Sequence, residues 1–443
     1  MPEAVDQLIH AQWIIPVVPE NLLLSDHTLV VNRGRISAIL PTDKVAEQYH
    51  SAQEISLPGH ALIPGLINSH THAAMALLRG LADDMPLMSW LNEHIWPAEA
   101  RWVSEEFIHD GTQLAVAEML LGGTTCFNDM YFFPDITGRV ASSAGIRAVL
   151  GLIAIDFPSA WASDGDDYLH KGLQVHDQFR TNPIIHTAFA PHAPYSVADP
   201  ILERIRTLAD ELEIPVHMHL HETHDEIVQG LQHQGKRPME RLHDLGLLSP
   251  SLAAVHMTHL EEGEIERFAA SGGQVVHCPE SNLKLASGFC PVTELIEAGV
   301  NVALGTDGAA SNNDLDMFSE MRSAALLAKG VAKDASALPA AKALSMATIN
   351  GARALGLQQE TGSLEPGKSA DLVAVDLNRI NTLPVYHPIS QLVYAAGREQ
   401  VSHVWVAGRH LVSEGSLTTL DLQQLSGHSR DWRERILAAD VDN

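Results

Sequence analysis

The middle of the chain alternates short apolar runs with amphipathic segments, and this alternation limits the fold more than any other feature. Amphipathic stretches suited to helices lie at residues 104–121, 198–213 and 261–270. Buried parallel strands read as continuous apolar runs, and strands that alternate with helices are typical of parallel sheets. The strand candidates are Ala61–Ser69, Thr124–Asp129, Arg147–Ala154, Ile184–Ala190, Val216–Leu220, Ala253–Thr258, Gln274–Cys278 and Val302–Thr306.

These repeats predict an α/β fold, a closed (β/α)8 barrel, over residues 63–363. About 300 residues is near the usual size of such a barrel. An open, doubly wound sheet is the alternative, but no GxGxxG motif follows the first strand. We therefore favour the barrel.

Both ends of the chain read as short strands joined by turns. Near the start, Asn32-Arg33-Gly34 is typical of a hairpin turn, and near the end Ala407-Gly408-Arg409 separates two more strands. Neither end has enough strands for a stable sheet of its own. We expect residues 1–62 and 364–443 to pair into one small β-sandwich domain beside the barrel.

The charge balance excludes two classes of partner. The net charge of −27 comes from 55 acidic and 28 basic residues, which repels nucleic acid and anionic membranes. The partner expected instead is a small molecule. Three cysteines without CxxC spacing fit a reducing compartment, and the first residues lack the pattern of a signal peptide. We expect a cytoplasmic protein.

Histidine and aspartate residues recur at the ends of the predicted strands, where barrel enzymes carry their catalytic groups. The first strand leads into His70-Thr71-His72, and alternate residues of an extended segment share one face, so both imidazoles can converge on one ion. Such side chains are ligands that zinc or ferrous iron takes. Others lie at the fifth strand (His217, His219, His221), the sixth (His256, His259) and the eighth (Asp307).

Four of these strand ends carry a resemblance. PGLINSHTH, HMHLHE, HMTHL and LGTDGAASNN resemble the signatures of the amidohydrolase superfamily, and within it the chain is similar to the 5-methylthioadenosine/S-adenosylhomocysteine deaminase family. MPLMSWLNEHIWPAEA, APHAPYS and GSLEPGKSADLVAVD extend the likeness over nearly the whole chain. The resemblance implies a metal-dependent hydrolase that acts on carbon–nitrogen bonds.

The resemblance also implies a role for individual residues. Glu222, three residues after His219, would shuttle a proton, and His256 would orient the attacking hydroxide. Glu99 and His192 would hold the sugar of a nucleoside. Asp307 would bind the metal and also accept a proton from the water. The metal ligands would be His70, His72, His219 and Asp307.

We expect one divalent ion. Binuclear members of the superfamily bridge two metals through a modified lysine after the fourth strand, where this chain has Ala190-Pro191-His192 and no lysine nearby. Zn²⁺ is the ion we favour. Fe²⁺ and Mn²⁺ stay as alternatives, because the ligand types suit all three ions.

Plainer explanations stay open for several of these residues. Glu99 can be a carboxylate near a helix start, and His192 a loop histidine. Within the fifth strand, His219 is chosen only from the HxxE pairing of the family. His259 fits a structural role. Met85, Met88 and Trp90 form either a lid or ordinary core.

The expected reaction converts 5′-methylthioadenosine to its inosine analogue and ammonia, with S-adenosylhomocysteine or adenosine as further substrates. The loop after the third strand, residues 156–167, is acidic and lacks the arginine that a carboxylate tail favours. This favours the methylthio substrate. The alternatives are a guanine or other nucleobase deaminase, a triazine-type hydrolase, and a non-catalytic scaffold. We expect a homo-oligomer, either a dimer or a tetramer.

Overall fold

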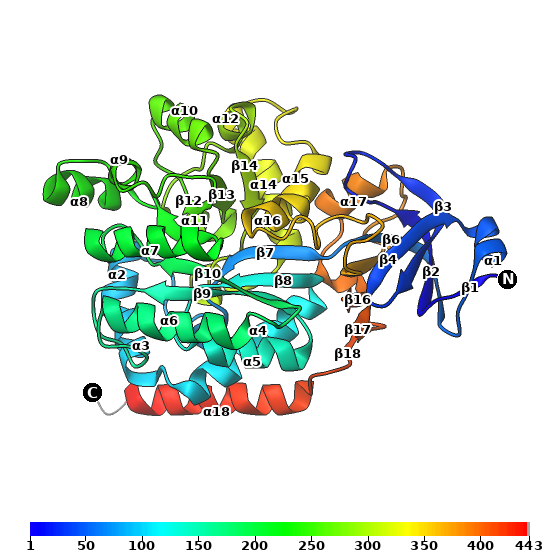
Figure 1. The fold of residues 1–443 in the computed structure, drawn as a ribbon, viewed down its shortest axis with the longest axis horizontal. Helices are drawn as coiled ribbons and strands as arrows, with labels where there is room; N and C mark the ends of the chain where they lie inside the picture. Colours follow the sequence, from blue (N-terminus) through cyan, green and yellow to red (C-terminus); the bar gives the residue numbers. More distant parts are fainter. Residues whose placement is uncertain (441–443) are drawn as a thin grey trace.

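The computed structural model describes residues 1–440, and within them a parallel barrel forms the larger part of the fold (Figure 1). Its strands pair in sequence order from β7 to β14, as expected for a barrel. The strands are β7 (Leu66–Thr71), β8 (Thr124–Asp129), β9 (Arg147–Ala154), β10 (Ile185–Pro191), β11 (Val216–Leu220), β12 (Leu252–His256), β13 (Gln274–His277) and β14 (Asn301–Leu304).

Helices surround this sheet and cover its outer face (Figure 1). Several begin at residues that cap the free backbone N–H groups of a first turn: Ser104 accepts from Phe107 N, and Asp164 from Asp167 N. The main helices are α4 (Glu105–Leu121), α5 (Pro134–Ala144), α6 (Gly165–Phe179), α7 (Asp199–Leu212), α8 (His224–Gln234), α9 (Pro238–Asp244), α10 (Glu262–Ser271), α11 (Pro279–Lys284), α12 (Val292–Glu297), α14 (Met317–Ala332), α15 (Ala340–Met346) and α16 (Ile349–Ala354).

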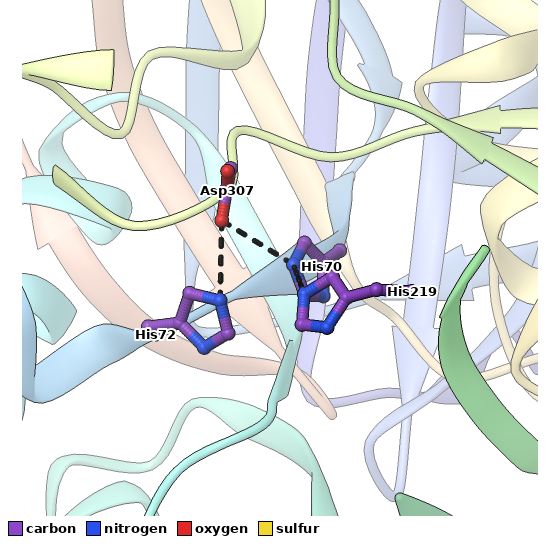
Figure 2. Close-up of side chains that lie close together, drawn as sticks. All are labelled: His70, His72, His219 and Asp307. Carbon is purple, nitrogen blue, oxygen red and sulfur yellow. Dashed lines mark hydrogen bonds and ion pairs between the residues drawn. The ribbon is translucent and has the colours of Figure 1, made fainter. Parts of the chain in front are cut away.

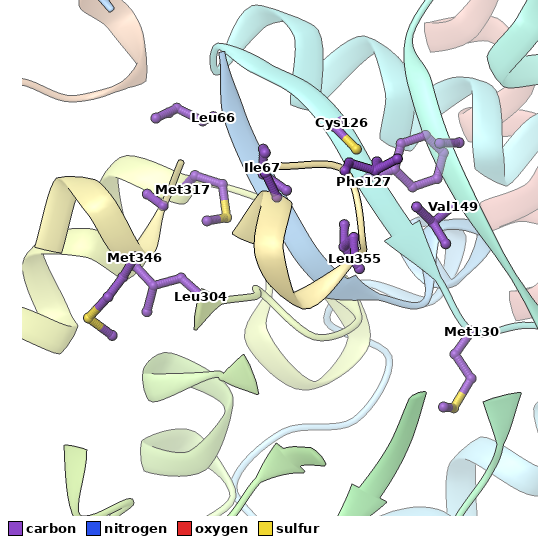
Figure 3. Packing of buried hydrophobic residues seen from close by; sticks show 14 of the residues in the cluster. Leu66, Ile67, Cys126, Phe127, Met130, Val149, Leu304, Met317, Met346 and Leu355 are labelled. Atoms are coloured by element: carbon purple, nitrogen blue, oxygen red, sulfur yellow. The ribbon is translucent and has the colours of Figure 1, made fainter. Parts of the chain in front are cut away.

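The barrel strands are buried on both faces, and most of their residues are apolar. Strands β8, β9, β11 and β12 are buried along their whole length. Figure 3 shows side chains of the first strands, among them Ile67, Phe127 and Val149, packed in one cluster with Leu355 from beyond the last strand. The predicted barrel is therefore confirmed.

The last strand closes onto the first. Asp307 N, just beyond β14, donates a hydrogen bond to His70 O at 3.0 Å. Thr306 N donates to the side-chain oxygen of Asn68, also at 3.0 Å. A Cβ at Gly305 would lie 2.7 Å from His70 N, so only glycine lets the two strand ends approach this closely.

Both ends of the chain contribute to a second sheet, as predicted. Strand β15, from the C-terminal part, lies between β6 and β16 and is antiparallel to both. Arg33 and Gly34 have positive φ values of 51° and 74°, which fits the predicted hairpin turn. The strands are β2 (Gln7–Ile14), β3 (Leu24–Asn32), β4 (Arg35–Pro41), β6 (Glu54–Pro64), β15 (Leu372–Asp376), β16 (Val401–Val406), β17 (Arg409–Ser413) and β18 (Ser416–Leu417).

The predicted strand Ala61–Ser69 is divided between the two sheets. Its first residues end β6 at Pro64, and its last ones begin β7 at Leu66. Gly65 separates them, and a Cβ there would lie 1.9 Å from Thr125 Oγ1. The chain runs from one sheet into the other without a linker that would mark a domain boundary. The proposed boundary between residues 62 and 63 therefore stays a prediction.

The C-terminal helix α18 (Leu422–Asp440) lies along the barrel, away from the β sheet (Figure 1). Trp432 is buried there, and its indole N–H donates to Asp110 of α4 at 2.9 Å. The assignment of residues 364–443 to one β domain stays a prediction; in this segment β15–β18 belong to the second sheet, and α18 packs against α4. Across the described residues, every helix is too short or too polar to span a bilayer.

A buried ion pair connects the barrel to the second sheet. Arg147, at the start of β9, donates from Nε to Asp371 Oδ2 at 2.8 Å, and the two side chains are 2% and 0% exposed. Asp371 directly precedes β15 and also accepts from Ala407 N. Burial raises the pKa of Asp371, but the charge of Arg147 outweighs this and holds the pKa below its ordinary value.

We expect Arg147→Met to lower the free energy of unfolding by about 3–5 kcal/mol, because it leaves the Asp371 carboxylate buried and unpaired. Urea denaturation followed by circular dichroism measures this change. Arg139→Met is the matched control, since Arg139 pairs with Asp135 at 3.0 Å on the exposed face of α5 and should contribute less than about 1 kcal/mol. Equal effects of the two substitutions would contradict the account.

Candidate active site

Four side chains predicted as metal ligands meet at the C-terminal end of the barrel (Figure 2). Their candidate ligand atoms all lie within 4.8 Å of one another. Asp307 Oδ1 is 3.3 Å from His70 Nε2 and 3.2 Å from His72 Nε2. His219 Nε2 is 3.1 Å from His70 Nε2. The structure thus brings the predicted set together from the end of β7, from β11 and from the loop after β14.

The hydrogen bonds of the three imidazoles favour metal binding. Nδ1 of His72 lies 2.6 Å from Met130 O, and Nδ1 of His219 lies 2.8 Å from His192 O. A carbonyl can only accept, so Nδ1 of each of these two rings carries a proton, and Nε2 is the nitrogen that can bind a cation when the ring is neutral. Three nitrogens and one carboxylate oxygen suit a divalent ion such as zinc.

The Asp307 carboxylate is held on both sides. Oδ2 accepts from the hydroxyls of Ser281 at 2.6 Å and Ser311 at 3.0 Å. Burial raises the pKa of Asp307, but hydrogen bonds from His70 and His72 outweigh it and hold the pKa well below its ordinary value. The carboxylate is therefore ionised, with Oδ1 directed at the histidines.

Burial keeps most of the surrounding histidines neutral, as metal ligands must be. It lowers the pKa of His219 well below the ordinary value and that of His70 to about 4. Burial also lowers the pKa of His72, but hydrogen bonding to Asp307 outweighs it and raises the value to about 9. Protonated His72 thus balances the negative charge of Asp307, since the two side chains face each other at 3.2 Å.

Glu222 and His256 lie beside this group. Glu222 Oε1 is 3.8 Å from His256 Nε2, and the His256 ring stacks on His219 with centroids 5.4 Å apart. Asn282 Oδ1 fixes the other ring nitrogen of His256 at 2.8 Å. Burial raises the pKa of Glu222, although the charge of His256 opposes it. A carboxyl group with a raised pKa is suited to carry a proton.

A second carboxylate holds the backbone of Glu222. Glu226 accepts from His221 N at 3.0 Å and from Glu222 N at 2.8 Å, so it fixes the turn after β11. Burial raises the pKa of Glu226 to about 8. This support was not predicted; the spacing of Glu226 in the first turn of α8 was the available signal.

Glu99 and His192 face the same cavity as His72, His219 and Asp307. Glu99 belongs to α3 (Trp96–Trp102) and accepts from the hydroxyl of Tyr131 at 2.6 Å. Burial raises the pKa of Glu99 to about 6, although that hydrogen bond opposes it. His192 follows β10, and its Nδ1 lies 3.0 Å from Ser196 Oγ. Tyr131, which follows β8 and orients Glu99, was missed by sequence reasoning.

The contacts of the other strand-end histidines and of the lid candidates indicate which of them have a structural role. His221 accepts from Met239 N, and His259 Nε2 contacts Ser287 O, so both are structural within the described residues. His217 lies beneath the ligands, against His70. Trp90 lines the cavity, whereas Met85 packs in the adjacent cluster.

Comparisons with known proteins agree with this geometry. The model of the amidohydrolase family matches residues 61–411. A curated 5-methylthioadenosine/S-adenosylhomocysteine deaminase of Teredinibacter turnerae is 54% identical and one of Saccharophagus degradans is 50% identical; the matches cover 98% of this chain and 98% and 97% of theirs.

A solved structure is similar over the whole chain. The crystal structure of an adenosine deaminase from Xanthomonas campestris with bound zinc is 53% identical and superposes with a TM-score of 0.98. The match covers 99% of this chain and 100% of the other. From the family model, the relatives and this structure, the chain belongs to the amidohydrolase family and, within it, to the 5-methylthioadenosine/S-adenosylhomocysteine deaminases.

Proposed function

We propose that this enzyme hydrolyses the 6-amino group of 5′-methylthioadenosine and releases the inosine analogue and ammonia. One observation carries the proposal: a three-histidine, one-aspartate group opens into the same cavity as Glu222, His256 and Glu99, in a chain that is 54% identical to a named deaminase. The two carboxylates and His256 supply what a nucleoside deaminase needs beside its metal: a proton carrier, an orienting base and a sugar ligand.

One divalent ion, proposed to be Zn²⁺, would be held by Nε2 of the three histidines and Oδ1 of Asp307. When bound, such an ion lowers the pKa of water towards neutrality and supplies the hydrolytic nucleophile. Its replacement by Fe²⁺ or Mn²⁺ would leave these ligand roles unchanged.

In this proposal, Glu222 delivers a proton to the ring nitrogen next to C6, which removes aromatic resistance to attack. Its raised pKa suits that role. His256 orients the attacking water through Nε2, because Asn282 occupies its Nδ1. Asp307 accepts the remaining proton of the water and passes it to the leaving ammonia. The proposal thus assigns the proton of the ring nitrogen to Glu222 and the proton of the leaving group to Asp307.

We place the tail of the nucleoside in an apolar cavity beside the metal site. Beyond Glu99 a second cavity continues from the first and shares Trp96, Glu99, Phe132 and Phe157 with it. Apolar groups such as Val103 and Pro158 line the rest, and among residues 1–440 no lysine or arginine does. A methylthio group fits this lining, whereas the carboxylate of S-adenosylhomocysteine would lack a cation and lie near Glu99.

We also propose a cytoplasmic location and a homo-oligomer, a dimer or a tetramer. The three cysteines are buried and unpaired, which supports a reducing compartment. Most soluble oligomers are symmetric homo-oligomers, and dimers are the commonest of them. Size-exclusion chromatography with light scattering measures the mass in solution, and a mass of about 48 kDa would contradict the second part.

The function is tested by metal analysis and an ammonia-release assay on the purified enzyme. We expect one equivalent of metal per chain and a kcat/KM for 5′-methylthioadenosine about tenfold or more above that for S-adenosylhomocysteine, because an unpaired carboxylate loses a charge-assisted hydrogen bond. Adenosine should react more slowly. Faster turnover of guanine or a triazine would contradict the proposed reaction, and faster turnover of S-adenosylhomocysteine would contradict the proposed substrate preference.

Ala100 offers a sharper test of the tail site, because it is exposed on α3 and lines the second cavity. We expect Ala100→Arg to raise kcat/KM for S-adenosylhomocysteine relative to 5′-methylthioadenosine. Ala100→Met adds similar bulk without charge and should not raise this ratio. A rise with both variants, or with neither, would argue against the proposed path of the tail.

Glu222→Gln should lower kcat by about 10²–10⁴-fold and leave the metal content unchanged, because a glutamine cannot carry the proton and Glu222 is not a proposed ligand. Ammonia release and metal analysis on the same sample measure both. Glu211→Gln, an exposed residue of α7, is the control and should behave as the unmodified enzyme. Near-normal turnover of Glu222→Gln would remove Glu222 from the mechanism.

The raised pKa of Glu99 predicts a pH dependence of substrate binding. The carboxylate accepts hydrogen bonds from the ribose best when ionised, so KM should rise as the pH falls through about 6. Steady-state kinetics between pH 5 and 8 measure this. Glu99→Gln has no titrating group there, so its KM should be higher and should lose that dependence. An unchanged acidic limb in this variant would assign it to another group.

A further inference from the structure

The three ligand histidines each use Nδ1 in a hydrogen bond, but their partners differ in kind. His72 and His219 face the backbone carbonyls of Met130 and His192. His70 faces another imidazole, with Nδ1 at 2.8 Å from Nε2 of His217. Of the three contacts, only the last involves a side chain that substitution can remove.

This difference matters for the protonation of His70. A carbonyl can only accept, which places the proton on Nδ1 of its partner, whereas an imidazole nitrogen can accept or donate. Nε2 of His70 is the atom that faces His219 and Asp307. It can bind a cation only if the proton of His70 is on Nδ1 and His217 Nε2 accepts it.

His217 then carries its own proton on Nδ1, which is buried and has no hydrogen-bond partner among the described residues. An unpaired buried N–H group costs about 1–3 kcal/mol. The side chain is 1% exposed, a position where an apolar residue would avoid this cost. The retained imidazole is therefore best explained by what its other nitrogen does.

The strand itself supplies the pairing. His217 and His219 are alternate residues of β11 and share one face of the strand. His219 reaches the ligand group directly, and His217 lies one step deeper, where its ring centroid is 5.0 Å from that of His70. One strand thus provides a ligand and the partner of a ligand from another strand.

We propose that His217 is a positioning residue: it accepts the Nδ1 proton of His70, keeps Nε2 of His70 free, and so sets the metal affinity of the site. The inference rests on the proposed metal site but adds a residue that is not a ligand. Partners of this kind change metal affinity by about 10–100-fold in other proteins.

The test measures the zinc dissociation constant of metal-depleted protein by competition with a chromophoric chelator. His217→Leu removes the acceptor and should weaken zinc binding by about 10–100-fold. His217→Gln places an oxygen near the position of Nε2 and should restore most of the affinity. His217→Asn is also polar but too short to reach His70, so it should resemble the leucine variant.

Two controls separate positioning from folding. His186→Gln replaces a half-buried histidine near the start of β10, at the opposite end of the strand from the ligands, and should bind zinc as the unmodified protein does. The thermal unfolding midpoint of each metal-depleted variant reports its fold. The absorption spectrum of bound Co²⁺ should change in His217→Leu and return in His217→Gln. If the leucine variant does not fold, the glutamine and asparagine pair decides alone.

The results separate this inference from the function. Zinc affinity of His217→Leu within about twofold of the unmodified protein would overturn the inference while leaving the metal site intact. Equal affinities of the glutamine and asparagine variants, with both folded, would also overturn it. If the unmodified protein binds no stoichiometric zinc, the proposed function fails instead.

Discussion

The closure of the barrel between β14 and β7 is the constraint on which the rest of the site depends. Asp307 N bonds to His70 O, and Thr71 Oγ1 donates to Asp307 O, both at 3.0 Å. These contacts join residues more than two hundred positions apart and place a carboxylate from the last strand against two histidines from the first. Without closure, the histidines of the first strand and the aspartate after the last would lie at opposite edges of an open sheet.

Around this junction, a second layer of groups fixes the orientation of each functional side chain. Carbonyls hold His72 and His219, two serine hydroxyls hold Asp307, and Asn282 holds His256. Glu226 fixes the backbone beneath Glu222. Side chains held in this way meet a transition state without reorganisation, which is how a preorganised site lowers a barrier. The proposed role of His217 extends the same layer to His70.

Sequence reasoning predicted the elements that have a strong periodic signal. Strands β8, β9 and β11 match their predicted limits, and β9 contains the continuous apolar run that is typical of a buried parallel strand. The change of sheet at Gly65 was not predicted, since Pro64 and Gly65 lie inside one apolar run. A side chain at position 65 would collide with Thr125, and the two positions meet only in the folded chain.

The residues of the candidate site also fall into those that the sequence predicted and those that it did not. The candidate ligands followed from strand ends and from the family resemblance, but alternation could not distinguish His219 from its neighbours on β11. That choice needs the position of His70 and Asp307 in space. Tyr131 and Asn282, which orient Glu99 and His256, carry no local pattern and are brought to the site by packing alone.

Anomalous diffraction at the zinc edge, from crystals of the zinc-loaded enzyme, tests the central claim most directly. The account predicts one peak per chain, about 2.0–2.2 Å from Nε2 of the three histidines and from Oδ1 of the aspartate. The ligands should be His70, His72, His219 and Asp307. A second peak within the barrel, or a single peak bound through Nδ1 atoms or through His217 or His221, would contradict it.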